Sequence, residues 1–265
     1  MLKITTDNLR KNYKRLELVV ENLEKGFDGK HVLTGAGLVF EQGKIYGLLG
    51  RNGAGKTTLF NCLSGELQAD RGRMKLLEGH SSRDLQAEDV GYVHSLPMLP
   101  EFLTGYEFIR FYTDVNQAAI ADQGDDIDAL FNLMSIEESD RHKLIKYYSH
   151  GMKNKLQMLL VLLMRPPVIL LDEPLTSLDV VVALEMKQLL RKMKDDHVLI
   201  FSTHILQLAA DLCDELIVLH RGKLTRVSAE VLKQPDFEQQ VIELLSEDDA
   251  GDPESGEVGA HAGDA

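Results

Sequence analysis

The sequence has no tryptophan and only two cysteines, Cys62 and Cys213, among its 265 residues. Without a Cys-x-x-Cys pair, neither a disulfide framework nor a zinc cluster is supported, and we expect two buried free thiols. Long apolar runs are also missing, since the longest, Met158 to Met164, stops at Arg165-Pro166-Pro167. A membrane-spanning helix needs about 20 apolar residues, so we expect a core helix here and no span. The N-terminus lacks the apolar stretch of a signal peptide.

Basic residues are in the minority, with 29 Lys and Arg against 42 Asp and Glu, for a formal net charge of −13. Proteins that bind nucleic acid non-specifically neutralise its phosphates, so this balance argues against a nucleic-acid partner. The charge is uneven along the chain. Residues 1–15 form a basic extension, which we expect to be solvated, whereas residues 246–265 contain seven acids and no Lys or Arg. We expect this acidic tail to be disordered, because it is too polar to form a core.

The rest of the chain alternates between short apolar runs and helical patterns, which predicts an α/β fold with a mostly parallel sheet. We expect strands at residues 16–23, 31–33, 37–40, 45–49, 168–171, 198–202, 215–219 and 224–227. Helical patterns cover residues 57–64, most of 97–165, and 180–194. Thr104 and Glu107 fit a capping box at the start of a helix. In that helix, Phe108, Phe111 and Tyr112 have the spacing of core residues.

Polar residues follow three of the predicted buried strands. A glycine-rich loop follows residues 45–49, Asp172-Glu173 follows residues 168–171, and His204 closely follows residues 198–202. In open α/β sheets, ligands bind beyond the carboxyl ends of the strands. These three segments therefore predict one ligand site at that edge of the sheet.

The glycine-rich loop, Gly50-Arg51-Asn52-Gly53-Ala54-Gly55-Lys56-Thr57, matches the pattern G-x-x-x-x-G-K-[ST]. Glycines let successive backbone N–H groups point at phosphate oxygens, and the following helix adds its positive N-terminal end. Lys56 supplies a charge for the β- and γ-phosphates, and the Thr57 hydroxyl is a Mg²⁺ ligand. A dinucleotide-binding loop is a weaker alternative, because Lys-Thr after the last glycine is not its signature. The candidate nucleotide-binding residues here are Gly50, Asn52, Gly53, Ala54, Gly55, Lys56, Thr57 and Thr58.

The second polar segment supplies two adjacent carboxylates. Asp172 ends an apolar strand and is expected to hold Mg²⁺, through water. Glu173 lies directly after it, and a second carboxylate beside the metal can polarise the attacking water as a general base. Alone, Asp-Glu-Pro would be read as a simple strand-ending turn.

Taken together and in this order, the motifs resemble those of the ATP-binding cassette (ABC) transporter ATPases, over roughly residues 16–228. Tyr148-Ser149-His150-Gly151-Met152 is similar to the family signature and lies 23 residues before Asp172. Leu175 to Asp179 resembles the family's aspartate loop, and His204 matches its switch histidine. Phe27 occupies the position of the aromatic residue that stacks on adenine.

The resemblance implies a P-loop NTPase core with an N-terminal antiparallel β subdomain and an inserted α-helical subdomain (about residues 97–165), within an ATPase domain at residues 16–245. It further implies ATP and Mg²⁺ as cofactors, with Lys56, Glu173 and His204 catalytic. Two such subunits, identical or different, would meet head to tail. Ser149 and Gly151 would then contact the ATP of the partner, and Asp179 would couple the two sites.

Two departures from the family pattern are visible. The family often has Tyr-Val-Pro-Gln where this chain has Tyr92-Val93-His94-Ser95, so Ser95 replaces the glutamine that ligates Mg²⁺. Ser95 has a shorter reach and would act through water, while His94 is expected to be a surface or loop residue. In the signature, His150 and Met152 replace Gly and Gln. These changes bear on coupling and turnover more than on nucleotide binding.

The resemblance implies the ATPase subunit of a transporter, bound peripherally at the cytoplasmic face of a membrane. It would drive substrate movement through separate permease subunits, and its phosphate loop and signature look more like those of exporters. Two alternatives stay open. One is an ABC ATPase without a transporter, acting on a protein or nucleic-acid complex. The other is a nucleotide-gated module with little hydrolysis, suggested by Ser95 and His150.

Overall fold

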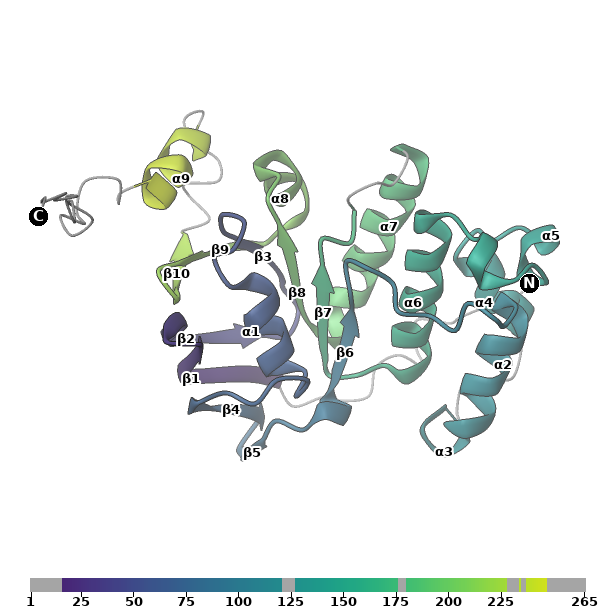
Figure 1. The fold of residues 1–265 in the computed structure, drawn as a ribbon, viewed down its shortest axis with the longest axis horizontal. Helices are drawn as coiled ribbons and strands as arrows, with labels where there is room; N and C mark the ends of the chain where they lie inside the picture. The colour runs from purple at the N-terminus through teal and green to yellow at the C-terminus, as the bar shows by residue number, and fades with distance from the viewer. Residues whose placement is uncertain (1–15, 121–126, 176–179, 228–233, 235–236, 247–265) are drawn as a thin grey trace, which may run out of the picture.

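The computed structural model describes residues 16–120, 127–175, 180–227, 234 and 237–246 (Figure 1). It contains two sheets and flanking helices, which confirms the predicted α/β class. The basic extension at residues 1–15, the predicted coupling residue Asp179 and the tail from residue 247 lie outside the described residues. The domain boundaries stay predictions. Within the described residues, no helix has both the length and the apolar character needed to cross a bilayer.

The central sheet has six strands in the order β10-β9-β3-β8-β7-β6. The parallel strands are β3 (Ile45–Leu49), β6 (Val90–Val93), β7 (Val168–Asp172), β8 (Val198–Thr203) and β9 (Glu215–His220). β10 (Lys223–Val227) closes the edge as an antiparallel hairpin with β9. Every residue of β3, β7 and β8 is buried, as continuous apolar runs require. Because these three strands are neighbours, the polar segments that follow them meet at one edge.

The second sheet is antiparallel, in the order β2-β1-β4-β5. Its strands are β1 (Leu16–Phe27), β2 (Lys30–Glu41), β4 (Arg71–Glu78) and β5 (Ser81–Asp84). We expected two short strands at 31–33 and 37–40, and this was wrong, because β2 is continuous through both. A register shift against β1 passes over Gly35, whose φ of 99° is in the left-handed region. Glycine adopts this conformation without the usual steric cost, so the strand bends instead of ending.

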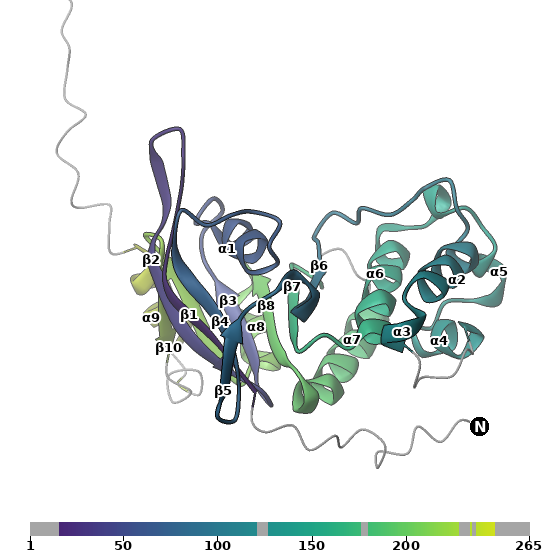
Figure 2. The ribbon, with the colours of Figure 1, turned by 90° about the horizontal axis from the view of Figure 1, so that it is seen from below.

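The helices flank the central sheet and extend beyond one of its edges. α2 and the neighbouring short helices lie on the far side of α6 from the sheet in both ribbon views (Figures 1 and 2). The bounds are α1 (Lys56–Leu63), α2 (Gly105–Val115), α3 (Gln117–Ile120), α4 (Ile127–Leu133), α5 (Glu138–Arg141), α6 (His150–Met164), α7 (Val180–Met193), α8 (Leu206–Leu212) and α9 (Phe237–Ser246). Short 3₁₀ turns cover Ala87–Asp89, Ile145–Tyr147 and Lys194–Asp196.

Core packing confirms most of the sequence expectations and corrects two, the burial of Cys213 and that of Phe111. The capping box of α2 forms as predicted, and Cys62 is a buried free thiol whose pKa burial raises to about 11. Cys213 is free but only partly buried. Phe108 and Tyr112 pack on the core, whereas Phe111 is 60% exposed, so its placement in the core was wrong. Phe111 lies two residues, or about 200° of helix rotation, from the fully buried Ile109.

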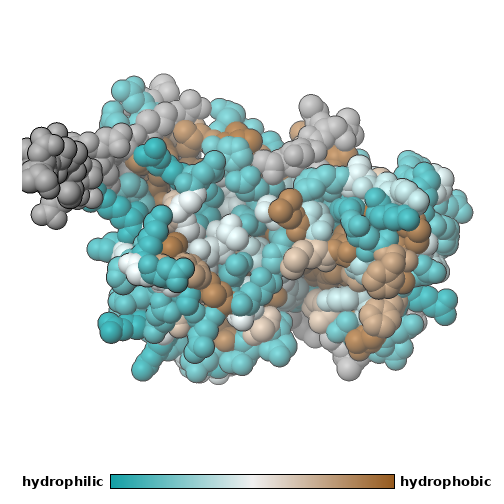
Figure 3. Space-filling model, in the orientation of Figure 1, coloured by the Kyte–Doolittle hydropathy of each residue, from teal (hydrophilic) through white to brown (hydrophobic). Residues whose placement is uncertain are grey.

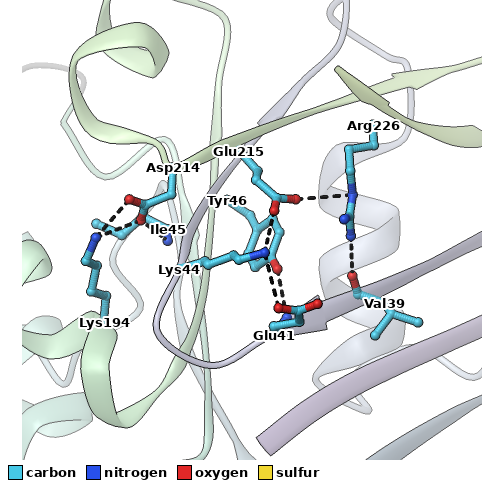
Figure 4. A network of polar contacts seen from close by, with 9 residues as sticks. All are labelled: Val39, Glu41, Lys44, Ile45, Tyr46, Lys194, Asp214, Glu215 and Arg226. Carbon is cyan, nitrogen blue, oxygen red and sulfur yellow. Dashed lines mark hydrogen bonds and ion pairs between the residues drawn. The ribbon is translucent and has the colours of Figure 1, made fainter. Parts of the chain in front are cut away.

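A polar network at the start of β9 joins the two sheets (Figure 4). Glu215 accepts a hydrogen bond from Lys44 Nζ at 2.6 Å and pairs with Arg226 Nε at 3.1 Å. Arg226 also donates to the main-chain oxygen of Val39 in β2, at 2.8 Å. Lys44 reaches Glu41 at 3.1 Å. This Arg226–Val39 contact therefore ties β10 of the central sheet to β2 of the antiparallel sheet.

A second contact joins the sheets at the β9–β10 turn. The Thr34 hydroxyl donates to the main-chain oxygen of Arg221 at 2.6 Å, and the Thr34 N–H donates to that of Gly222 at 3.0 Å. A Cβ at Gly222 would lie only 2.6 Å from the Thr34 nitrogen. Only glycine permits this close approach of the two sheets.

Candidate active site

A cavity of about 470 Å³ opens at the edge of the molecule where β3 and β7 end and the β1–β2 hairpin approaches. Ten residues proposed from the sequence line it, and only Val32 was not anticipated. The ten are Phe27, Asn52, Gly53, Gly55, Lys56, Thr57, Thr58, Ser95, Asp172 and Glu173. Gly50 and Ala54 belong to the same loop but do not line the cavity.

The phosphate loop takes the conformation that its glycines allow. Gly53 and Gly55 have φ angles of 80° and 102°, and Gly55 directly precedes α1. Lys56 is 8% exposed and donates from Nζ to the main-chain oxygens of Gly50 (2.7 Å) and Arg51 (3.3 Å). Burial lowers the pKa of Lys56, and the negative charges of Glu173 and Asp172 partly oppose this effect. The loop thus lines the cavity with Asn52, Gly53, Gly55 and one lysine, Lys56, whose ammonium group is held by the loop's own carbonyl oxygens.

Asp172 is held by hydroxyl groups from two neighbouring segments. Its Oδ2 accepts from Thr57 Oγ1 at 2.9 Å, and its Oδ1 accepts from Ser202 Oγ at 2.5 Å. The described residues hold no cluster of three His, Cys, Asp or Glu side chains that could bind a metal. Mg²⁺ is commonly held by one or two protein oxygens together with water and substrate phosphates. The facing oxygens of Thr57 and Asp172 at the cavity fit that mode.

Glu173 has a backbone φ of 50°, in the left-handed region that non-glycine residues rarely adopt. Its N–H donates to Ser202 Oγ at 3.0 Å, and its Oε1 lies 2.9 Å from His204 Nδ1. The structure therefore brings the predicted base and the predicted switch histidine into direct contact. His204 itself does not line the cavity.

Ser202 is a residue that sequence reasoning missed. It is fully buried in β8, is paired in register with Asp172, and contacts both carboxylate residues of the site. The available signal was a hydroxyl residue near the end of an otherwise apolar strand. Ser202 reaches the two carboxylate residues only because β8 pairs with β7 in a register that places it beside Asp172. This register could not be predicted from the sequence.

Ser95 lines the cavity, and the residue before it is firmly held. The His94 ring lies 3.9 Å from the Tyr92 ring, between centroids, and its Nε2 lies 3.1 Å from Glu66 Oε1. The Gln157 side-chain amide donates to the His94 main-chain oxygen at 3.2 Å. His94 is thus a loop residue, as expected, but its side chain is only 23% exposed.

Phe27, the last residue of β1, lines the same cavity as the phosphate loop. Its side chain and backbone together are 45% exposed. Val32 follows on β2, and its Cγ1 lies 2.7 Å from where a Cβ of residue 55 would be. Gly55 is therefore required by its neighbour as well as by its φ angle. Val32 gave no signal in the sequence beyond being apolar.

The signature residues do not reach this cavity. Ser149 is the N-cap of α6 and accepts a hydrogen bond from the Met152 N–H at 3.2 Å, and Gly151 lies in the first turn. Neither residue lines the cavity. Asp179 lies outside the described residues. Contacts of these residues with nucleotide stay predictions.

Comparison with known proteins places these features in a family. A model of the protein family ABC_tran, described as ABC transporter, matches residues 33–176, which is more than half of the chain. Similar curated proteins include the ABC transporter ATP-binding proteins YxlF of Bacillus subtilis strain 168 and all4389 of Nostoc sp. The first is 29% identical over 78% of this chain and 69% of that protein, and the second is 34% identical over 72% and 58%.

Another relative is a sulfate/thiosulfate import ATP-binding protein, CysA 1 of Chromobacterium violaceum. It is 32% identical over 83% of this chain and 64% of its own length. The chain thus spans from somewhat over half to about two thirds of these relatives.

Solved structures share the fold. One, described as the ATP binding subunit of an ABC transporter, has a TM-score of 0.76 at 25% identity and covers 86% of this chain and 98% of its own. Another, cbiO1 of Clostridium perfringens, is described as part of the ABC transporter complex cbiONQ. It has a TM-score of 0.68 at 27% identity, over 88% of this chain and 95% of its own. These likenesses confirm the P-loop NTPase fold expected from the motifs.

Proposed function

Because the chain belongs to the ABC transporter family, whose ATP-binding proteins are ATPases, we propose that it hydrolyses ATP to move a substrate through separate membrane subunits. The observation that carries this proposal is the cavity itself. Groups suited to bind phosphate, hold a metal and activate water all face or adjoin one space (Lys56, Thr57, Asp172, Glu173 and His204).

ATP would lie with its base on Phe27 and its phosphates in the loop between Gly50 and Thr58. The N-terminal end of α1 and the Lys56 ammonium favour negative charge there. Thr57 and Asp172 would hold Mg²⁺, with Ser95 reaching it through water. When bound, Mg²⁺ neutralises charge on the phosphate oxygens.

Glu173 would take the proton of the attacking water as general base. His204 contacts the Glu173 carboxylate and would orient that group, and its expected contact with the γ-phosphate is part of the proposal. Ser202 supports both steps, since it fixes the Glu173 backbone and one Asp172 oxygen. These contacts give each residue one defined task.

A second ATPase subunit would complete the site. Ser149 and Gly151 are at the start of α6 and do not line the cavity of their own chain, so we propose that they meet nucleotide on another copy or a related chain. Nucleotide bound between two subunits favours the closed pair over the open one by differential affinity. Asp179 would link the two sites.

A separate permease is the proposed membrane partner. Apolar side chains are exposed on the helical side of the molecule (Figure 3), and a contiguous apolar surface marks an interaction site. The exposed large apolar residues of α2 and of the chain just before it include Leu96, Met98, Phe102, Phe111 and Val115. Docking would place the chain at the cytoplasmic face of a membrane. We favour export because of the phosphate-loop and signature sequences, although the named relatives include an import protein.

The test is to purify the chain with its partners from detergent-solubilised membranes and reconstitute the complex in vesicles. We expect a permease to copurify, and ATP-dependent phosphate release and substrate movement out of the cytoplasmic side. A complex without membrane protein would favour the alternative of a transporter-independent ABC ATPase. Nucleotide binding with negligible phosphate release would favour the gated module that Ser95 and His150 suggest.

A further inference from the structure

Two residues beside Phe27 are not explained by the proposed mechanism. Lys25 and Phe27 are two positions apart on β1, with a register shift against β2 between Lys25 and Gly26. The Lys25 Nζ lies 5.4 Å from the centre of the Phe27 ring, within the range of a cation–π contact. Phe27 lines the cavity and Lys25 does not. The ammonium group therefore contacts the ring without itself lining the cavity.

Asp70 holds Lys25 in this position. Its Oδ1 accepts from Lys25 Nζ at 2.8 Å, and its Oδ2 accepts from the Gly26 N–H at 2.8 Å. The Asp70 N–H donates to the Glu24 main-chain oxygen at 2.9 Å. These bonds involve three successive residues of β1, immediately before Phe27. Asp70 precedes β4, the strand that pairs with β1, so it is fixed by the sheet.

The pair is well defined for a surface feature. The Lys25 side chain is only 13% exposed, although lysine ammonium groups usually extend into water. The hydrogen bond from Lys25, followed by that from the Gly26 N–H, lowers the pKa of Asp70 below its usual value, so the carboxylate stays ionised. The adjacent turn is tight, with φ angles of 47° at Asp28 and 83° at Gly29. Phe27 is thus contacted by an ammonium group that is itself held in place, while 45% of the Phe27 surface stays exposed.

We propose that Lys25 and Asp70 are positioning residues that hold the Phe27 ring in place for the nucleotide base. This inference rests on the proposed function, because it requires ATP in the cavity with its base on Phe27. A half-exposed phenylalanine side chain would otherwise lose rotamer freedom on binding the base, at a cost in affinity. The contacts of Lys25 with the Phe27 ring and with Asp70 restrict the ring before the nucleotide binds, and so remove part of that cost. Binding of the triphosphate in the loop does not involve this pair.

The inference is tested by comparing ATP with tripolyphosphate, which has the phosphates but no base. The variant Lys25→Met keeps the apolar stem and removes the charge. We expect its Kd for Mg²⁺-ATP to rise about two- to fivefold, the range of a partly exposed cation–π contact, with the Kd for Mg²⁺-tripolyphosphate unchanged. Binding is measured by calorimetry on the full-length chain. In hydrolysis assays, KM for ATP rises by the same factor and kcat does not change.

A second variant and a matched control separate positioning from folding. Asp70→Asn keeps an oxygen for the Gly26 N–H but loses the charge, and we expect it to resemble Lys25→Met. Lys75→Met removes a lysine that pairs with Glu21 at 3.1 Å in the same sheet, and we expect wild-type ATP affinity. In a Phe27→Ala background, Lys25→Met should add no further loss.

Equal losses for ATP and tripolyphosphate in Lys25→Met would overturn the inference, because the pair would then support the phosphate loop in general. An unchanged ATP affinity would also overturn it. If the wild-type chain binds tripolyphosphate and ATP equally well, the base makes no contribution and the positioning role is rejected while the phosphate site stands. If it binds neither, the proposed function itself fails.

Discussion

Glu173 illustrates how much of the site is decided by single residues. Its left-handed backbone conformation costs of order 1–3 kcal/mol for a non-glycine residue and persists only when neighbours fix it. Ser202 holds its N–H, and His204 contacts its carboxylate. This unfavourable conformation at the end of β7 directs a carboxylate toward the histidine. Backbone strain thus coincides with the residue that we propose as the general base.

The variant Glu173→Gln tests the role of this carboxylate. The amide keeps the shape of the side chain but cannot accept a proton from water, so we expect hydrolysis to slow by roughly 10²–10⁴-fold. Steady-state phosphate release measures this effect. ATP affinity should be retained, and a closed dimer should accumulate on sizing columns. Wild-type turnover would remove Glu173 from the mechanism.

Lys56→Ala tests the phosphate contact. The change removes the only ammonium group among the residues that line the cavity in the described structure, so we expect useful ATP binding to be lost. Fluorescent nucleotide titration measures it. Lys143→Ala serves as the control, because Lys143 is exposed and pairs only with Asp140 on the surface. Equal affinity in the Lys56 variant and the wild type would contradict the assigned role.

At the scale of elements, α2 shows that local sequence can define a helix start. Thr104 Oγ1 accepts from the Glu107 N–H at 3.1 Å, and Glu107 Oε2 accepts from the Thr104 N–H at 2.9 Å. Both groups would otherwise have no partner within the helix. The capping box is therefore a stability feature of the helical side of the molecule.

Thr104→Ala should lower the free energy of unfolding by about 1 kcal/mol, the usual cost of losing an N-cap side chain. Urea unfolding followed by circular dichroism measures it. Thr113→Ala is the matched control in the same helix, since Thr113 only donates back to the Ile109 oxygen at 2.8 Å. That change should stay within about 0.5 kcal/mol of the wild type. Similar losses in both variants would show that the cap is not the cause.

Elements differed in how well the sequence predicted them. β3, β7 and β8 were found because burial on both faces requires a continuous apolar run. β5, with four exposed residues in Ser81-Ser82-Arg83-Asp84, has no such pattern, and β4 buries only Leu76.

In the site, contiguous motifs gave Lys56, Asp172 and Glu173 directly. Ser202 and Val32 were missed, because they act only through strands that pair or fold back in space.

At the scale of the whole molecule, the signature and the cavity are apart. Ser149 caps α6, and none of the residues that line the cavity comes from that helix. This separation is what the proposed two-subunit site requires, with the cavity of one chain and the signature of another on either side of the nucleotide. Hydrolysis is expected to depend on protein concentration, as two-chain sites do.

Ser149→Arg should block association with a second subunit while leaving ATP binding to the single chain unchanged. The reason is the bulk and charge of arginine at a surface that must approach a partner. Ser149→Ala is the control, because it removes the helix cap without adding bulk. Binding is measured by titration and association by light scattering with ATP. If Ser149→Arg lost nucleotide binding as a single chain, the proposed two-subunit geometry would be wrong.

Two of the contacts that join the two sheets use main-chain oxygens as acceptors. Arg226 bonds the backbone oxygen of Val39, and Thr34 bonds the backbone oxygen of Arg221. A backbone oxygen is present whatever side chain evolution places there. Across descendants of this gene, the side chain at position 39 is therefore less constrained by this joint than Thr34, Gly222 and Arg226, while position 221 is restricted by its own backbone φ of 47°.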